Sequence, residues 1–261
     1  MDCSVGWEGA KMSTEAVIET QELSKIYNGE TAVDQLSFAV NSGEIFGFLG
    51  PNGAGKTTTL LMLLGLTEPT SGSARVLGLD PTRDPIKVKQ KIGYLQENMG
   101  FYVDLNAVQM LKFVGELNGV TATLAEERIE GALQAVGLHD EAAKKIGAYS
   151  RGMRQRLGIA ELLIKDSKVA FLDEPTLGLD PDATNRMIDL IRRLCQDKQM
   201  TILLSSHMLQ QVQKICHRIG IMIKGKMVAQ GPMEQLAKEK FGLGKETFTL
   251  EEIYMKYFQE A

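Results

Sequence analysis

Five short stretches of the chain are continuously apolar. They are residues 45–50 (IFGFLG), 92–96 (IGYLQ), 169–175 (VAFLDEP), 201–206 (TILLSS) and 218–223 (RIGIMI). Runs of this kind are typical of strands that are buried on both faces, as in a parallel sheet between helices. The segments between them carry apolar residues at helical spacing, such as Met187, Ile188, Ile191 and Leu194. This alternation predicts an α/β fold with a mostly parallel sheet.

Ahead of residue 50 the pattern predicts a different unit. Residues 17–27 (VIETQELSKIY) and 31–40 (TAVDQLSFAV) have the character of strands, and the turn residues NGE at 28–30 join them. Two strands with so short a connection are expected to pair as an antiparallel hairpin. We therefore expect an N-terminal antiparallel β subdomain.

Between residues 99 and 155 the strand patterns disappear. Apolar positions at helical spacing predict a helix ended by Gly119, through Ala107, Met110, Leu111, Val114 and Leu117. Thr123 and Glu126 have the spacing of a capping box, which predicts the start of a second helix that Gly137 ends. We expect this stretch to be an α-helical subdomain inserted into the sheet.

The chain of 261 residues is long enough for one large domain. The patterns assign residues 1–14 to a disordered tail, 15–240 to the domain and 241–261 to a short C-terminal helical extension. Within the domain, the core is expected to comprise residues 15–98 and 156–240, and the helical subdomain residues 99–155. The stretch 249–261 is amphipathic, which favours packing over membrane anchoring.

Composition narrows the classes of function. The net charge of −4 and the pI of about 5.6 do not favour nucleic-acid binding, because such proteins are usually basic. The longest apolar run, LLMLLGL at 60–66, is far shorter than the ~18–20 residues of a membrane span. Three scattered cysteines lack metal-ligand spacing and are typical of a reducing cytoplasm.

The strongest chemical motif is GPNGAGKTT, which follows a predicted buried strand and precedes a helical pattern. It comprises Gly50, Pro51, Asn52, Gly53, Ala54, Gly55, Lys56, Thr57 and Thr58. Its glycines let consecutive backbone amides surround phosphate oxygens at a helix N-terminus. Lys56 supplies a positive charge, and the Thr57 hydroxyl can bind magnesium. The alternative, a glycine-rich turn without a ligand, is disfavoured by the strand and helix on either side.

A second motif, VAFLDEP, places two acids at the end of a predicted strand. In a parallel sheet this end faces the phosphate site. Asp173 is expected to hold Mg²⁺ through water, and Glu174 to polarise an attacking water. Two adjacent acids favour hydrolysis over phosphoryl transfer to another substrate. Helix-capping acids are the alternative interpretation for an isolated Asp-Glu pair.

With these motifs in this order, residues 16–235 resemble the ATP-binding subunit of an ABC transporter. The resemblance implies roles for three further residues. Tyr27 matches the aromatic residue that stacks on adenine, and Gln96 matches the glutamine that reaches magnesium and water. His207 in LLSSH matches the switch histidine of the catalytic site, although alone it would be interpreted as a helix-capping residue.

The resemblance extends to the signature motif, here Tyr-Ser-Arg-Gly-Met at 149–153. The usual signature is Leu-Ser-Gly-Gly-Gln, so Arg151 and Met153 depart from it, whereas Ser150 and Gly152 are retained. Ser150 is a plausible N-cap with no acid in the following turn, which suits an anion from elsewhere. In the family, Ser150, Gly152 and Asp180 of the D-loop (GLDP) meet the ATP of a partner copy. This signature variant resembles the branch that serves ABC-2-type exporters.

The resemblance also implies cofactors and partners. ATP and Mg²⁺ are expected, with Thr57, Gln96 and Asp173 as the magnesium residues. The cassette is expected to form a head-to-tail dimer with itself or a paralogous cassette, at the cytoplasmic face of the membrane. A separate multi-span permease is implied and no nucleic acid is expected. Two rival classes remain: soluble ABC-type ATPases that act on nucleic acid or ribosomes, which commonly carry two cassettes, and P-loop kinases or regulators, which lack a signature and a D-loop.

Overall fold

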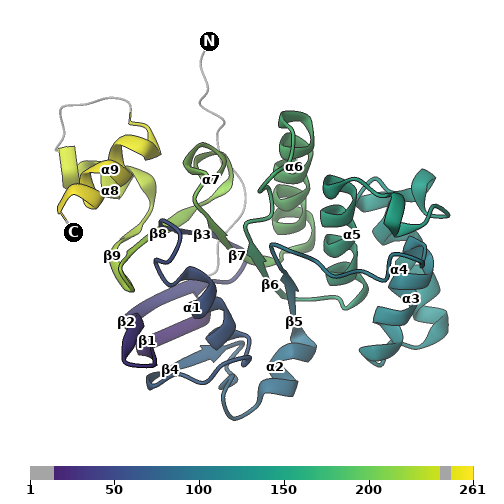
Figure 1. Ribbon diagram of the computed structural model, residues 1–261, viewed down its shortest axis with the longest axis horizontal. Helices are drawn as coiled ribbons and strands as arrows, with labels where there is room; N and C mark the ends of the chain where they lie inside the picture. Colours follow the sequence, from purple (N-terminus) through teal and green to yellow (C-terminus); the bar gives the residue numbers. More distant parts are fainter. Residues whose placement is uncertain (1–14, 242–247, 261) are drawn as a thin grey trace.

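The computed structural model describes residues 15–241 and 248–260. The predicted tail at 1–14, and residues 242–247 and 261 of the predicted C-terminal extension, lie outside the described residues. In the described part, two sheets pack against each other, and helices surround the larger one (Figure 1).

The larger sheet has six strands in the order β5-β6-β7-β3-β8-β9. Their bounds are Ile92–Leu95 (β5), Val169–Asp173 (β6), Thr201–Ser206 (β7), Ile45–Leu49 (β3), Arg218–Ile223 (β8) and Lys226–Gly231 (β9). The first five are parallel and coincide with the five apolar runs, so the predicted mostly parallel sheet is confirmed. Strand β9 pairs antiparallel with β8 at the sheet edge. Its sequence KMVAQG is only partly buried, and it lacks the long apolar run that reveals the other strands.

The smaller sheet is antiparallel, with the order β2-β1-β4. It comprises β1 (Ala16–Tyr27), β2 (Glu30–Asn41) and β4 (Ser71–Val76), so the predicted N-terminal hairpin is confirmed and gains a third strand. The Phe38 ring stacks on Phe46 and Phe48 of β3, with ring centroids 5.7 and 5.4 Å apart. This apolar layer fixes the hairpin beside the strand that leads into the glycine-rich motif.

The helices are α1 (Lys56–Leu63), α2 (Pro85–Lys91), α3 (Ala107–Leu117), α4 (Ala122–Ala135), α5 (Arg151–Ile164), α6 (Pro181–Lys198), α7 (Leu209–Ile215), α8 (Met233–Phe241) and α9 (Leu250–Glu260). Figure 1 shows α3, α4 and α5 together beyond α6, whereas α8 and α9 lie at the opposite end. Helix α5 runs without interruption through residues 155 and 156, where the sequence patterns predict the boundary between the helical subdomain and the core. The insert is therefore continuous with the core through this helix.

The start of α4 differs from the prediction. The helix begins at Ala122 with Thr121 as N-cap, and Ala125 N already donates to Thr121 O at 2.8 Å. Thr123 therefore lies inside the helix, and the predicted capping box with Glu126 is wrong. Glu126 instead pairs with Lys112 of α3 at 2.9 Å. The end at Gly137 is confirmed, because this residue has φ +64° just beyond the helix.

Helix α9 packs on the core through one face, as its pattern predicts. Leu250, Ile253 and Tyr257 are buried, whereas Phe258 is exposed. The Leu250 amide donates to Gln213 Oε1 of α7 at 3.0 Å, and the Tyr257 hydroxyl donates to Glu239 of α8 at 3.2 Å. Among residues 15–241 and 248–260, no helix combines the length and apolar character that a membrane span requires.

One buried acid affects the pH dependence of stability. Glu161 of α5 has a carboxylate oxygen, Oε1, that is shielded from solvent and has no hydrogen-bond partner among the described residues. Burial raises its pKa from 4.5 to about 7, against the opposing charge of Lys165. The Lys165 ammonium is itself directed at Lys89 O and Ile92 O, at 2.9 and 2.8 Å. The folded protein therefore favours the neutral acid at position 161.

We expect Glu161→Gln to stabilise the protein at pH 8 by roughly 1–3 kcal/mol and to have little effect at pH 5. Because the carboxyl pKa is higher in the folded than in the unfolded chain, the wild-type free energy of unfolding falls as pH rises from 4.5 to about 7. The neutral amide removes this dependence. Urea unfolding of both proteins at the two pH values is the measurement. An equal difference at pH 5 and pH 8 would contradict the assignment.

Candidate nucleotide site

The glycine-rich segment 50–58 lies where the central strand β3 ends and α1 begins. At two of its glycines the backbone passes so close to other segments of the protein that a side chain would not fit. A Cβ atom on Gly50 would lie 2.3 Å from Met222 O, and one on Gly55 would lie 2.3 Å from Ala32 O. Gly55 also has φ +101°, in the region that favours glycine. The segment is thus a close-packed turn that leads into a helix N-terminus.

Lys56 is the one cation of this segment, and its side chain is buried within the turn. Its ammonium donates to Gly50 O at 2.7 Å and to Pro51 O at 3.2 Å. It also lies 3.9 Å from Glu174 Oε1. Burial lowers the pKa of Lys56, and the charges of Glu174 and Asp173 oppose this effect. The ammonium is therefore held beneath the turn, facing the two acids at the end of β6, which is separated from β3 by β7.

The ends of β3, β6 and β7 bring hydroxyl and carboxylate oxygens together. The Thr57 hydroxyl donates to Asp173 Oδ2 at 3.0 Å, and the Ser205 hydroxyl donates to Asp173 Oδ1. Asp173 and Ser205 are direct partners in the parallel pairing of β6 and β7. Carboxylate and hydroxyl oxygens are hard ligands of the kind that Mg²⁺ prefers. Thr57 and Asp173, two of the three residues predicted to hold magnesium, are therefore chemically suited to this ion.

Glu174 is held by three neighbours. Its backbone has φ +49°, and its amide donates to Ser205 O at 3.1 Å. His207 Nδ1 lies 2.8 Å from Glu174 Oε1, and the Ser206 hydroxyl donates to Oε2 at 3.3 Å. A left-handed backbone is unfavourable for a non-glycine residue, so it persists only where neighbouring contacts stabilise it. The contacts of the carboxylate with His207 and Ser206 hold it in one orientation. The structure brings the two predicted catalytic residues together.

His207 does not have the alternative role of helix cap, since Met208 occupies the N-cap of α7. Sequence reasoning missed Ser205 and Ser206, which orient Asp173 and Glu174 respectively. The available signal was that two hydroxyl residues end an otherwise apolar strand, beside the strand that ends in two acids. Recognising it required knowledge that β6 and β7 are neighbours.

Two predicted residues remain at the periphery. The Tyr27 ring is 42% exposed and lies beneath the Lys25 ammonium, 4.8 Å from the ring centroid. Gln96 directly follows β5 and is exposed. No hydrogen bond among the described residues joins Gln96 to Thr57 or Asp173. Both side chains are thus accessible to a ligand and are not part of the central network.

The signature and the D-loop lie against each other. Ser150 is the N-cap of α5, and its hydroxyl accepts from Met153 N at 3.2 Å. A Cβ atom on Gly152 would be 3.3 Å from the Ala183 side chain of α6. Asp180 caps α6 by accepting from Ala183 N at 2.9 Å, and this hydrogen bond holds its pKa below the usual range. Within the described residues, no hydrogen bond or ion pair joins this group to residues 50–58.

Comparison with known proteins identifies the family. Residues 33–177 match the family described as ABC transporter. The chain is 40% identical to the bacitracin transport ATP-binding protein BcrA of Bacillus licheniformis, over 87% of this chain and 72% of that protein. It is 36% identical to the linearmycin resistance ATP-binding protein LnrL of Bacillus subtilis, with the same two coverages, 87% and 72%.

A solved structure supports the fold. It is the dimeric, post-hydrolysis state of the ATP-binding cassette MJ0796 bound to ADP and Pi, with a TM-score of 0.75 and 20% identity. The match covers 83% of this chain and 98% of that cassette. The two-sheet architecture with its helical insert is therefore the architecture of an ABC cassette. The chain belongs to the ABC transporter family, as an ATP-binding subunit that hydrolyses ATP to drive transport.

Proposed function

We propose that the phosphates of ATP bind over residues 50–58, with Lys56 on the outer phosphates and the adenine on Tyr27. The observation that carries this assignment is the convergence of Lys56, Thr57, Asp173 and Glu174 at the ends of three adjacent strands. When bound, Mg²⁺ would neutralise and orient phosphate oxygens, and Thr57, Asp173 and Gln96 would hold it. The remaining backbone amides of the turn complete the phosphate site.

Glu174 is proposed as the residue that polarises the attacking water. Its carboxylate is kept in place by His207 and Ser206, at 2.8 and 3.3 Å. An oriented carboxylate beside a buried ammonium can accept a proton from water close to the outer phosphate. His207 is then a positioning residue that holds the Glu174 carboxylate toward the water.

We propose that Ser150, Gly152 and Asp180 act on the ATP of a second cassette. Helix α5 has no acid in its first turn, so its N-terminus is suited to an anion. No described contact connects this N-terminus to residues 50–58 of its own chain, the P-loop. Two cassettes arranged head to tail would place each α5 N-terminus opposite the partner's P-loop, in a closed two-fold interface. MJ0796, which has the same fold, is dimeric with ADP and Pi.

The membrane partner is proposed to be a separate multi-span permease, with the cassette at the cytoplasmic face of the membrane. An apolar patch that begins a few residues after Gln96 in the sequence supports a docking site. Tyr102 is 59% exposed and Val103 51%, and the Phe113 ring of α3 lies edge-on to Tyr102 at 5.5 Å. The proposed direction, export, rests on the signature variant and on the resistance role in LnrL's name. Co-purification of the chain with a multi-span membrane protein tests the partnership.

The in-trans assignment predicts the effect of Ser150→Arg. We expect hydrolysis to fall at least about tenfold, because an arginine at the α5 N-cap obstructs dimer closure. ATP binding to the isolated monomer should remain nearly intact, since residues 50–58 are unchanged. Nucleotide titration and turnover assays on the purified variant measure the two quantities. If monomeric Ser150→Arg no longer binds ATP, α5 serves its own chain and the assignment is wrong.

A mixture with Lys56→Ala provides the complementary control. In a mixed dimer, the intact P-loop of the Ser150→Arg copy faces the intact signature of the Lys56→Ala copy. One composite site is restored, so ATP-dependent dimers should return in the mixture and be absent from either variant alone. Size-exclusion chromatography with ATP detects them. Absence of dimers in the mixture, with wild-type dimers present, would contradict the head-to-tail arrangement.

A further inference from the structure

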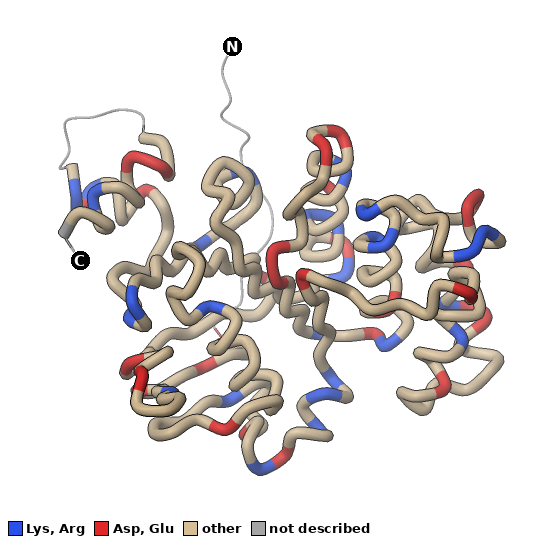
Figure 2. The backbone as a smooth tube through the Cα atoms, viewed as in Figure 1, with Lys and Arg blue, Asp and Glu red and all other residues tan. Residues whose placement is uncertain are grey.

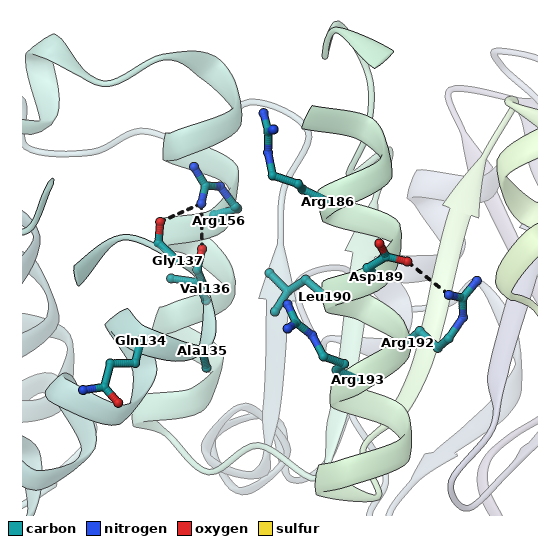
Figure 3. A pocket seen from close by; sticks show the side chains of 10 residues that line it. All are labelled: Gln134, Ala135, Val136, Gly137, Arg156, Arg186, Asp189, Leu190, Arg192 and Arg193. Carbon is teal, nitrogen blue, oxygen red and sulfur yellow. Dashed lines mark hydrogen bonds and ion pairs between the residues drawn. The ribbon is translucent and has the colours of Figure 1, made fainter. Parts of the chain in front are cut away.

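A pocket of about 460 Å³ lies between the end of α4 and helix α6 (Figure 3). Residues 134–137 and Arg156 of α5 form one wall, and α6 forms the other, with Leu190 directed toward the gap. None of the proposed nucleotide or signature residues lines it. A cavity of this size accommodates a small molecule.

The charge of the pocket is strongly unbalanced. Its lining contains four arginines, Arg156, Arg186, Arg192 and Arg193, and a single acid, Asp189. Asp189 is paired with Arg192 at 3.1 Å, and both extend to the far side of α6 from Arg156 (Figure 3). Elsewhere on the chain basic and acidic positions are interspersed (Figure 2), and the net charge is −4. The excess of positive charge is therefore a local property of this pocket.

The positive charges of the other three arginines around the pocket are compensated by few nearby carboxylates. Arg156 donates through Nη1 to Val136 O and Gly137 O, both at 2.8 Å, which leaves its other nitrogens as available donors. Arg186 is exposed and has a loose contact of 3.8 Å with Asp182. Within the described part of the chain, no carboxylate forms an ion pair with Arg156 or Arg193. Burial lowers the pKa of Arg156, and the like charge of Arg186 lowers it further.

The spacing of these groups indicates the length of a ligand. Arg186 and Arg193 are seven residues apart on α6, which corresponds to roughly 10 Å along the helix axis. A single phosphate is too short to contact guanidiniums at both ends, whereas a chain of two or three phosphates can bridge toward them. Guanidinium forms paired, charge-assisted hydrogen bonds with phosphate oxygens. A bound polyanion would also relieve the repulsion between the clustered cations.

We propose that this pocket binds a small soluble oligophosphate, held between Arg156, Arg186 and Arg193. The site goes beyond the proposed ATPase function and uses none of its residues. Because its walls come from α4 and α5 on one side and α6 on the other, the ligand would tie the helical insert to the core. Movement of the insert relative to the core would then depend on the concentration of this ligand.

The test is a calorimetric titration of the full chain with tripolyphosphate in the absence of Mg²⁺, which would bind the probe. We expect Arg186→Ala/Arg193→Ala to weaken the pocket's binding at least tenfold, because two charge-assisted contacts are lost. Both arginines are exposed positions of α6 where alanine maintains the helix, and thermal unfolding checks this. The matched control Arg192→Ala removes the same charge from the same helix, but from the Asp189 pair, and should change the affinity less than about threefold.

Two further titrations separate this site from the P-loop and define the ligand. Lys56→Ala should retain pocket binding, because its substitution lies in the other site. Orthophosphate should bind at least tenfold more weakly than tripolyphosphate, since it cannot span the arginines. The proposal is overturned if the double arginine variant binds like the wild type, if Lys56→Ala loses all tripolyphosphate binding, or if orthophosphate binds as tightly as tripolyphosphate.

Discussion

Glu174→Gln is expected to lower ATP turnover by ~10²-fold or more while ATP binding persists. The amide retains the size of the carboxylate, and its oxygen can still accept a hydrogen bond from His207 or Ser206. It cannot accept a proton from water, so the chemical step fails while the site remains assembled. ATP is then not consumed, and the two cassettes should stay together.

Two measurements check this expectation. Phosphate release gives the turnover, and size-exclusion chromatography with ATP and Mg²⁺ gives the dimer, which should elute earlier than the monomer only with nucleotide. Glu161→Gln is the matched control, because it makes the same substitution at a shielded acid of α5 outside the site. Its turnover should remain within about threefold of the wild type. If Glu174→Gln stays monomeric with ATP and hydrolyses normally, another residue activates the water.

Lys56→Ala is expected to lose both ATP binding and turnover. The substitution removes the one side-chain cation of residues 50–58. A hydrogen bond to a charged partner contributes ~1.5–3 kcal/mol, so binding should weaken about 10- to 100-fold. Turnover should fall further, because the outer phosphate also loses the charge that positions it. Titration with fluorescent nucleotide and phosphate release measure the two effects.

The control for Lys56→Ala must separate ligand binding from loop structure. The Lys56 ammonium donates to Gly50 O and Pro51 O, so its removal leaves two loop carbonyls without that donor. Thermal unfolding without nucleotide shows whether the fold persists. Lys87→Ala removes an exposed lysine that is paired with Asp84 at 2.7 Å, and should leave binding unchanged. Wild-type hydrolysis by a folded Lys56→Ala protein would rule out the assigned role.

The core strands and the phosphate turn could be predicted because their signals are local. A strand covered on both faces must be apolar at every position, and the five apolar runs become five buried strands. Gly50 and Gly55 are required where the backbone approaches Met222 and Ala32, so the glycines in the sequence indicate the tight turn. Ser150 was recognised as a helix cap for the same reason, since capping depends on residues within one turn.

The sequence pattern predicted secondary structure less well at an exposed sheet edge and at the end of a helix. Strand β9 is partly exposed at the edge of the sheet, so its mixed polar and apolar sequence did not indicate a strand. The N-cap of helix α4 is Thr121, two residues before the predicted cap Thr123, and Glu126 pairs with Lys112 of α3. A capping spacing is short and frequent, so it also occurs inside a helix that begins elsewhere. The local pattern therefore predicted the helix but not its first residue.

The sequence by itself determined the α/β fold and the tight glycine-rich turn at residues 50–58, because each depends on near neighbours along the chain. Tertiary structure alone decided how Glu174 is oriented, through Ser206 and His207 more than thirty residues away. It also decided that α4, α5 and α6 bring Arg156, Arg186 and Arg193 around one pocket. The physical reason is that hydrogen bonds and charge act over a few ångströms in space, and only the order β6-β7-β3 and the packing of the helices set those distances.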